Sequence, residues 1–173
     1  MNLTDTQEIA ADRATVWAAL LSPDVLKECI PGCKELTGSA KDGFEAVVVQ
    51  KVGPVKATFK GAVILSDLVT HESLVLLGEG QGGVAGFAKG GADVKLSDTV
   101  NGGTQLDFTV EAKVGGKMAQ LGSRIIDGFA KKMATQFFEK FSQVVGGEPL
   151  IEPEATKENA STKKGWVSRL TGG

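Results

Sequence analysis

The sequence predicts an α+β fold in which a curved, seven-stranded antiparallel sheet wraps around one long C-terminal helix. Residues 117–145 carry apolar side chains at steps of three and four, which places one continuous apolar stripe along a helix. Most of the preceding chain alternates with a period of two, which is typical of strands with one buried face. Because only a sheet could cover so long a stripe, the helix should lie against the inner face of the sheet.

The first predicted elements are a strand at residues 3–9 and two short helices. Asp12 is a candidate N-cap for the first helix, and Pro23 suits the first turn of the second, which should end near Glu28. The run Cys29-Ile30-Pro31-Gly32-Cys33 then predicts a sharp turn into the second strand.

Six further strands are predicted at residues 34–40, 44–52, 55–69, 73–79, 87–96 and 104–114. Their connectors carry turn residues, such as Gly53-Pro54 and Asn101-Gly102-Gly103. The long helix follows Gly115-Gly116 and should stop at Gly146-Gly147, since glycine favours the left-handed conformation that ends a helix.

The side chains predicted to face the long helix are unusually small. This inward set is Ala46, Ala57, Gly61, Ala88, Gly90, Ala92 and Ala112, and further glycines crowd the segment from Gly78 to Gly103. Some of these glycines could serve only to bend the sheet. Alternatively, the helix stands off from the small side chains and leaves an apolar pocket, which is the usual form of a binding site.

The residues predicted to line such a cavity come from the strands and the long helix. They are Ala46, Val48, Gln50, Phe59, Phe87, Phe108, Val110, Met118, Leu121, Ile125, Phe129 and Met133. Within this set, Gln50 is a candidate hydrogen-bond donor to a ligand carbonyl, and Phe87 is a candidate residue at the cavity mouth.

The chain is predicted to consist of a folded domain, residues 1–147, a linker, residues 148–162, and a tail, residues 163–173. The linker is polar and proline-containing, and it lacks the apolar residues that a packed core requires. The tail has three cations, no acids and apolar residues at helical spacing, which is typical of a weak interfacial anchor. The predicted membrane contacts are Lys163, Lys164, Trp166, Val167, Arg169 and Leu170, although a frayed tail with an incidental tryptophan would have the same composition.

Composition and residue types exclude several functions. The formal charge of −2 argues against a nucleic-acid partner, and no apolar run is long enough to span a bilayer. The N-terminus lacks the layout of a secretory signal, so a cytoplasmic location is expected.

The single histidine, His71, falls in a predicted turn. Cys29 and Cys33 alone are too few for a zinc site and are expected to be small, buried apolar residues at a turn. No catalytic or metal-binding residues are therefore predicted.

Several of these segments together resemble the CoxG family of carbon monoxide dehydrogenase subunits, which are START-like, helix-grip proteins. The resemblance rests on residues 29–33, on 52–61, on Gly86-Phe87-Ala88-Lys89-Gly90 and on the helix after Gly115-Gly116-Lys117. It implies a hydrophobic cavity in an accessory protein of molybdenum hydroxylases such as carbon monoxide dehydrogenase. It also implies recruitment of that enzyme to the inner face of the cell membrane and a non-covalent quinone ligand, menaquinone or ubiquinone.

Three functions are open at this point. The first is a non-catalytic module that holds a quinone or lipid and docks at the membrane. The second is a START-like cyclase or dehydratase, which would require an inward-facing acid or base that the strand alternation does not supply. The third is a ligand-free scaffold with a solid core that tethers a partner enzyme.

Overall fold

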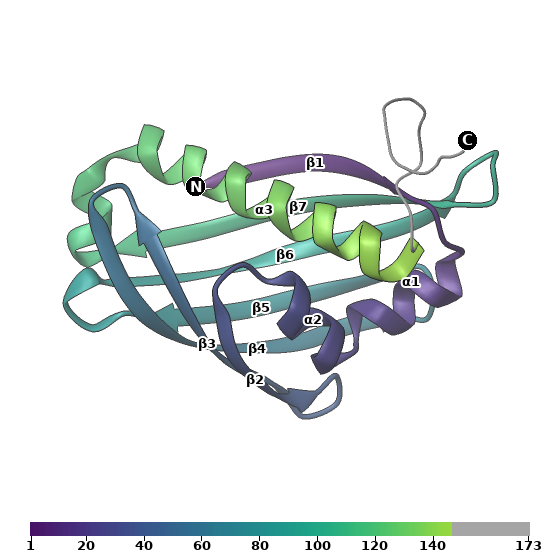
Figure 1. Ribbon diagram of the computed structural model, residues 1–173, viewed down its shortest axis with the longest axis horizontal. Coiled ribbons are helices and arrows are strands. Elements are labelled where there is room, and N and C mark those ends of the chain that lie inside the picture. The colour runs from purple at the N-terminus through teal and green to yellow at the C-terminus, as the bar shows by residue number, and fades with distance from the viewer. Residues whose placement is uncertain (147–173) are drawn as a thin grey trace, which may run out of the picture.

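The computed structural model describes residues 1–146, which form one antiparallel sheet with helices on a single face (Figure 1). The seven strands run in the order β1-β7-β6-β5-β4-β3-β2. They are β1 (Asn2–Ile9), β2 (Cys33–Ser39), β3 (Gly43–Val52), β4 (Val55–Val69), β5 (Ser73–Gln81), β6 (Phe87–Asp98) and β7 (Thr104–Gly115). The helices are α1 (Arg13–Leu20), α2 (Pro23–Cys29) and α3 (Ser123–Gly146), and two 3₁₀ segments are η1 (Gly83–Ala85) and η2 (Gly116–Leu121). The predicted fold class is confirmed.

Local sequence signals position the two short helices. The Asp12 carboxylate accepts a hydrogen bond from the Thr15 N–H at 2.8 Å and so caps α1, as its sequence position predicted. Ser22 caps α2 in the same way, and Pro23 occupies the first turn. Both helices pack against one end of the sheet's inner face.

The long helix begins later than its apolar spacing predicted. Residues 116–121 form the 3₁₀ segment η2, and α3 begins only at Ser123. Gly122 separates the two with a φ of 91°, a left-handed conformation that only glycine adopts without strain. Met118 and Leu121 therefore lie on η2 rather than on the helix. α3 continues through Gly146, the first glycine of the predicted stop, and Gly147 lies outside the described residues.

The hydrophobic core consists of two separate clusters. The larger one joins α1, α2 and the second half of α3 to β1, β5, β6 and β7, with Phe141 fully buried at its centre. Within it, the rings of Phe108 and Phe138 stack with their centroids 5.2 Å apart. The smaller cluster, at the other end of the sheet, is built on Val52, Ala85 and Met118.

Arg13 ties together the turns at the end of the molecule that holds the larger cluster. Its guanidinium donates to the Asp98 carboxylate at 2.9 Å and to the His71 carbonyl at 2.9 Å, and it thereby links the β4–β5 turn to the end of β6. His71 is exposed in that turn, as predicted. The predicted linker and tail, residues 148–162 and 163–173, lie outside the described residues.

Candidate functional site

The centre of the sheet's inner face is lined by the smallest side chains. The strand register places Ala46 opposite Gly61, Gly61 opposite Gly80, and Gly80 opposite Ala88. At the next inward position, two residues along each strand, Gly78, Gly90 and Ala112 form a second short row. We call these seven residues, Ala46, Gly61, Gly78, Gly80, Ala88, Gly90 and Ala112, the small-residue band. Residues that lie far apart in sequence thus form one continuous surface with little side-chain volume.

Above this band, α3 contributes its first half to the smaller core cluster and its second half, from Ala134 onward, to the larger one. Phe137, Phe138 and Phe141 belong to the larger core cluster, whereas Ile126 and Phe129 belong to the smaller one. Between them, Met133 is half-buried and belongs to neither cluster. The helix backbone approaches β1 and β3, which lie on either side of the four central strands. The helix therefore crosses the sheet from one side of the four central strands to the other.

The structure divides the predicted cavity residues among several environments. Phe108 and Val110 join the larger cluster, and Phe59, Met118, Leu121 and Phe129 join the smaller one. The half-buried residues Ala46, Val48 and Met133 lie between the clusters. Most of the residues predicted to line a cavity thus lie along the inner face, from one cluster to the other.

Two of the predicted lining residues lie away from this inner face. Phe87 pairs with Gly115 one position before the inward pair Ala88–Val114, so strand alternation places it on the outer face. Its ring lies directly over Gly115, and it is 46% exposed. Ile125 is 41% exposed and lies against the β3–β4 turn at Gly53.

Gln50 is half-buried at an inward position, but its amide already has a partner. The Nε2 group donates to the Pro31 carbonyl, which fastens the turn at residues 29–33 to β3. The backbone bond from Val49 N–H to the Gly32 carbonyl, at 2.9 Å, reinforces the same contact. Any bond from Gln50 to a ligand would use its second N–H or its carbonyl oxygen.

One acidic residue that was not among those predicted to face inward shares the inner face. Asp5 pairs with the inward residue Phe108, at the edge of the sheet. It is exposed, and its carboxylate accepts hydrogen bonds from the Thr6 N–H and the Gln7 amide. The alternation of β1 could have revealed it, since Leu3, Asp5, Gln7 and Ile9 share one parity.

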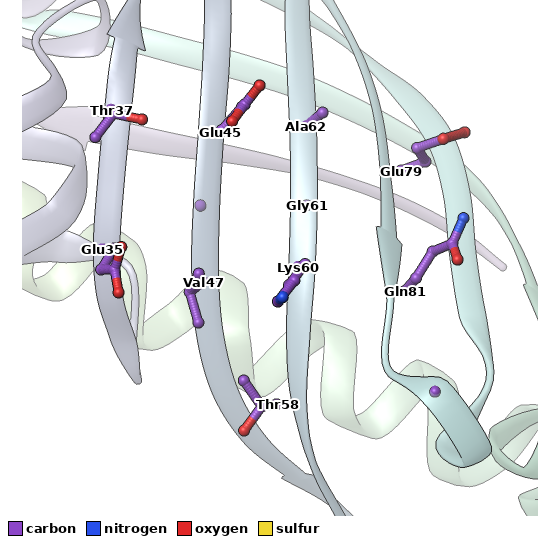
Figure 2. Close-up of a pocket in the computed structure, with 12 residues that line it drawn as sticks. Glu35, Thr37, Glu45, Val47, Thr58, Lys60, Gly61, Ala62, Glu79 and Gln81 are labelled. Atoms are coloured by element: carbon purple, nitrogen blue, oxygen red, sulfur yellow. The ribbon is translucent and has the colours of Figure 1, made fainter.

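A depression of about 660 Å³ lies on the opposite, outer face of β2 to β5. Figure 2 shows its side chains on the side of the sheet that faces away from the helix, among them Glu35, Glu45, Lys60 and Glu79. These four residues are charged, although Ala46, Val47 and Ala62 also line the depression. An apolar ligand that covered it would take those charges out of water, which is unfavourable. Sequence reasoning missed it because polar residues at alternate strand positions resemble an ordinary solvated face.

The thiols are not poised for chemistry. Cys29 is 2% exposed, and burial raises its pKa to about 11. Burial also raises the pKa of Cys33, whose Sγ lies 3.3 Å from the Glu35 carbonyl. Within residues 1–146, no three His, Cys, Asp or Glu side chains gather as metal ligands would. None of the helices in that range combines the length and apolarity needed to cross a bilayer.

Comparisons with known proteins agree on one family and one fold. The model of the CoxG family of carbon monoxide dehydrogenase subunits matches residues 6–146. The crystal structure of a conserved protein from Geobacillus kaustophilus is 30% identical, with a TM-score of 0.79 over 85% of this chain and 96% of that chain. No curated protein gave a match.

More distant structures share the fold alone. A protein from Rhizobium leguminosarum is 15% identical, with a TM-score of 0.63 over 86% of this chain and 95% of that one. A protein from Chromobacterium violaceum is 14% identical, with a TM-score of 0.61 over 84% and 97% of the two chains.

Proposed function

The chain belongs to the CoxG family of carbon monoxide dehydrogenase subunits, and from this premise we propose that it is a non-catalytic accessory protein of a molybdenum hydroxylase of the carbon monoxide dehydrogenase type. In this proposal it holds an apolar molecule, a quinone or a lipid, between α3 and the sheet. It also couples the enzyme to the inner face of the cell membrane.

The observation that carries this proposal is the small-residue band beneath the middle of α3. A core that needed no guest would place leucine or isoleucine there, as it does at Leu74, Leu96 and Leu106 at one end of the same strands. Burial of apolar surface contributes about 25 cal/mol per Å², so an isoprenoid tail that buries roughly 200 Å² would gain about 5 kcal/mol without a charged anchor.

The side chains around the band favour binding over catalysis. Those that line it are methyl groups or bare backbone, and Val48 and Met133 beside it are apolar. The inward carboxylate, Asp5, is exposed at the sheet edge rather than enclosed. This arrangement can solvate a hydrocarbon chain, and the redox chemistry would belong to the partner enzyme.

Native mass spectrometry tests the binding role directly. Protein purified from its own host should carry a quinone or lipid, or should take up added menaquinone or ubiquinone. Gly80→Leu should abolish uptake, because a Cβ there meets no atom closer than 3.9 Å and the larger side chain would occupy the band. Gly80→Ala is the matched control and should retain uptake. A protein that carries no apolar molecule and takes none up would contradict the proposal.

The tail, residues 163–173, supplies the second half of the proposal. Its cations and its apolar residues, including Trp166 and Leu170, suit the interface of an anionic membrane. Deletion of residues 163–173 should weaken membrane association of both the protein and its partner enzyme. Unchanged association after the deletion would show that the tail is not the anchor.

A further inference from the structure

Three segments that lie far apart in sequence meet at the end of the molecule that holds the smaller core cluster. They are residues 51–56, which form the β3–β4 turn, residues 82–89, which contain η1, and residues 113–125, which contain η2. A Cβ on Gly53 would lie 3.5 Å from Cγ2 of Ile125, and one on Gly116 would lie 2.5 Å from Cα of Gly86. We call these three segments the basic tip; the β3–β4 turn and the start of α3 stand at the left of Figure 1.

The basic tip carries six cations and no carboxylate. The cations are Lys51, Lys56, Lys89, Lys113, Lys117 and Arg124, and all are exposed. Within residues 1–146, the ion pairs are Arg13–Asp98 and Lys140–Glu28, so none of the six is in an ion pair there. Glu79 lies opposite Lys89 across β5 and β6, just outside the tip. Lys51 and Lys56 even face each other across β3 and β4, where like charges repel. This concentration of charge does not favour folding, and it suits an anionic partner.

Apolar side chains protrude among these cations. Val84 is 90% exposed, Phe87 is 46% exposed and Ile125 is 41% exposed. They come from two of the three segments of the tip, residues 82–89 and 113–125. Val84 lies in η1, Phe87 begins β6 and Ile125 lies in the first turn of α3. Exposed apolar side chains on segments that also carry lysines suit the water–lipid interface of a membrane with anionic headgroups.

The opposite end of the molecule provides an internal comparison. Its turns also expose apolar residues, with Val100 at 101% and Val69 at 48%. Their neighbours, however, are the acids Asp67, Glu72 and Asp98, and Arg13 there is already paired with Asp98. An anionic surface would repel that end and attract the basic tip.

We propose that the basic tip of the folded domain is a second membrane-docking surface, which binds anionic lipid headgroups independently of the C-terminal tail. The inference rests on the proposed function for its setting, because the tip closes the end of the space that would hold the apolar guest. Docking there would place the smaller core cluster, and the helix break at Gly122, between the bilayer and the small-residue band.

The test uses the full chain and vesicles of phosphatidylcholine, with or without phosphatidylglycerol. The wild-type protein should co-sediment with the anionic vesicles, and added salt should weaken its binding. The double variant Lys51→Glu/Lys56→Glu should bind at least about tenfold more weakly, because each cation near an anionic surface contributes about a fivefold preference. Lys27→Glu/Lys41→Glu changes the net charge equally outside the tip and should bind as the wild type does.

A second pair of variants tests the apolar contribution. Val84→Ser should weaken vesicle binding, whereas Val100→Ser, an equally exposed valine at the acidic end, should not. Neither substitution touches the core, so altered folding would not explain a difference.

Three outcomes would overturn the inference. The tip variants could bind vesicles as tightly as the wild type while only Lys163→Glu/Lys164→Glu loses binding, which would assign docking to the tail. Both pairs of double variants could lose binding equally, which would show a non-specific charge effect. The wild type could fail to bind anionic vesicles. If a purified acidic dehydrogenase then protected the tip lysines from acetylation, the tip would be a protein-binding surface. Quinone retention by Lys51→Glu/Lys56→Glu reports on the proposed function separately, since that variant leaves the band intact.

Discussion

Burial decides what the two cysteines can do. Cys29 ends α2 inside the larger core cluster, where desolvation of its thiolate raises the pKa to about 11. Cys33 is only half-buried, and its pKa is raised by the same cause. The sequence predicts both as small apolar residues at a turn, and the position of Cys29 in the core agrees with that interpretation.

The thiols should therefore differ in reactivity. At about pH 8 only about one in a thousand Cys29 side chains would be thiolate, so iodoacetamide should label Cys33 and spare Cys29 until denaturant is added. Peptide mass spectrometry before and after unfolding in urea measures this. Rapid labelling of Cys29 in the folded protein would show that the turn at residues 29–33 opens.

The same shift links stability to pH. The pKa of the Cys29 thiol rises from 9.0 to about 11 on folding. The contribution of this buried thiol to the free energy of unfolding is therefore complete below pH 9.0 and is lost as the pH rises through about 11. Relative to Cys29→Ala, the wild type should lose urea resistance over that range. Parallel curves for the two proteins would contradict this linkage.

At the scale of elements, the strands were predictable and the start of the long helix was not. Period-two alternation and turn glycines placed all seven strands, because both signals are local. Met118 and Leu121 are three residues apart, a spacing that fits both an α-helix and a 3₁₀-helix. The helix predicted from this spacing therefore continued across Gly122. Gly122 itself could have indicated the break, because a glycine inside a helix destabilises the helix by about 1 kcal/mol relative to alanine.

A matched pair of glycine substitutions tests this break. A Cβ at either Gly122 or Gly128 would meet no atom within 4 Å, so only backbone conformation distinguishes the two positions. Gly122→Ala should destabilise by about 1–2 kcal/mol because its φ is left-handed, whereas Gly128→Ala, inside α3, should stabilise by about 0.5–1 kcal/mol. Urea unfolding of the two variants gives both values. Equal stabilisation by both would mean that α3 extends through Gly122 in solution.

At the scale of the whole molecule, the candidate site emerges only when distant strands are placed side by side. The alternation of the sequence identified Ala46, Gly61, Ala88, Gly90 and Ala112 as inward, but Gly78 and Gly80 joined them only through the register of β5. Phe87 was expected at the cavity mouth although the alternation of β6 points it outward, because its glycine-rich surroundings suggested a loop. The basic tip was equally hidden, since its segments approach one another only after the sheet has formed.

The two-cluster core makes a thermodynamic prediction about the intact molecule. A ligand that binds only the folded state stabilises it by about 2.7 kcal/mol at a hundredfold excess over the Kd. For a chain of this size, that corresponds to a rise in Tm of about 5–10 °C. A soluble menaquinone analogue should therefore raise the Tm of the wild type and of Gly80→Ala by this amount.

The melting temperature of Gly80→Leu shows whether its added side chain fills an empty space or disrupts a packed core. Its leucine would supply part of the apolar volume that the guest provides, so the unliganded variant should melt no lower than Gly80→Ala and should show no further rise with the analogue. Differential scanning calorimetry with and without the analogue measures both quantities. If the analogue raised the Tm of Gly80→Leu as much as that of the wild type, the guest would bind elsewhere. If Gly80→Leu instead melted well below Gly80→Ala, the band would already be filled by the chain's own side chains, and a carrier built on an unfilled interior would be excluded.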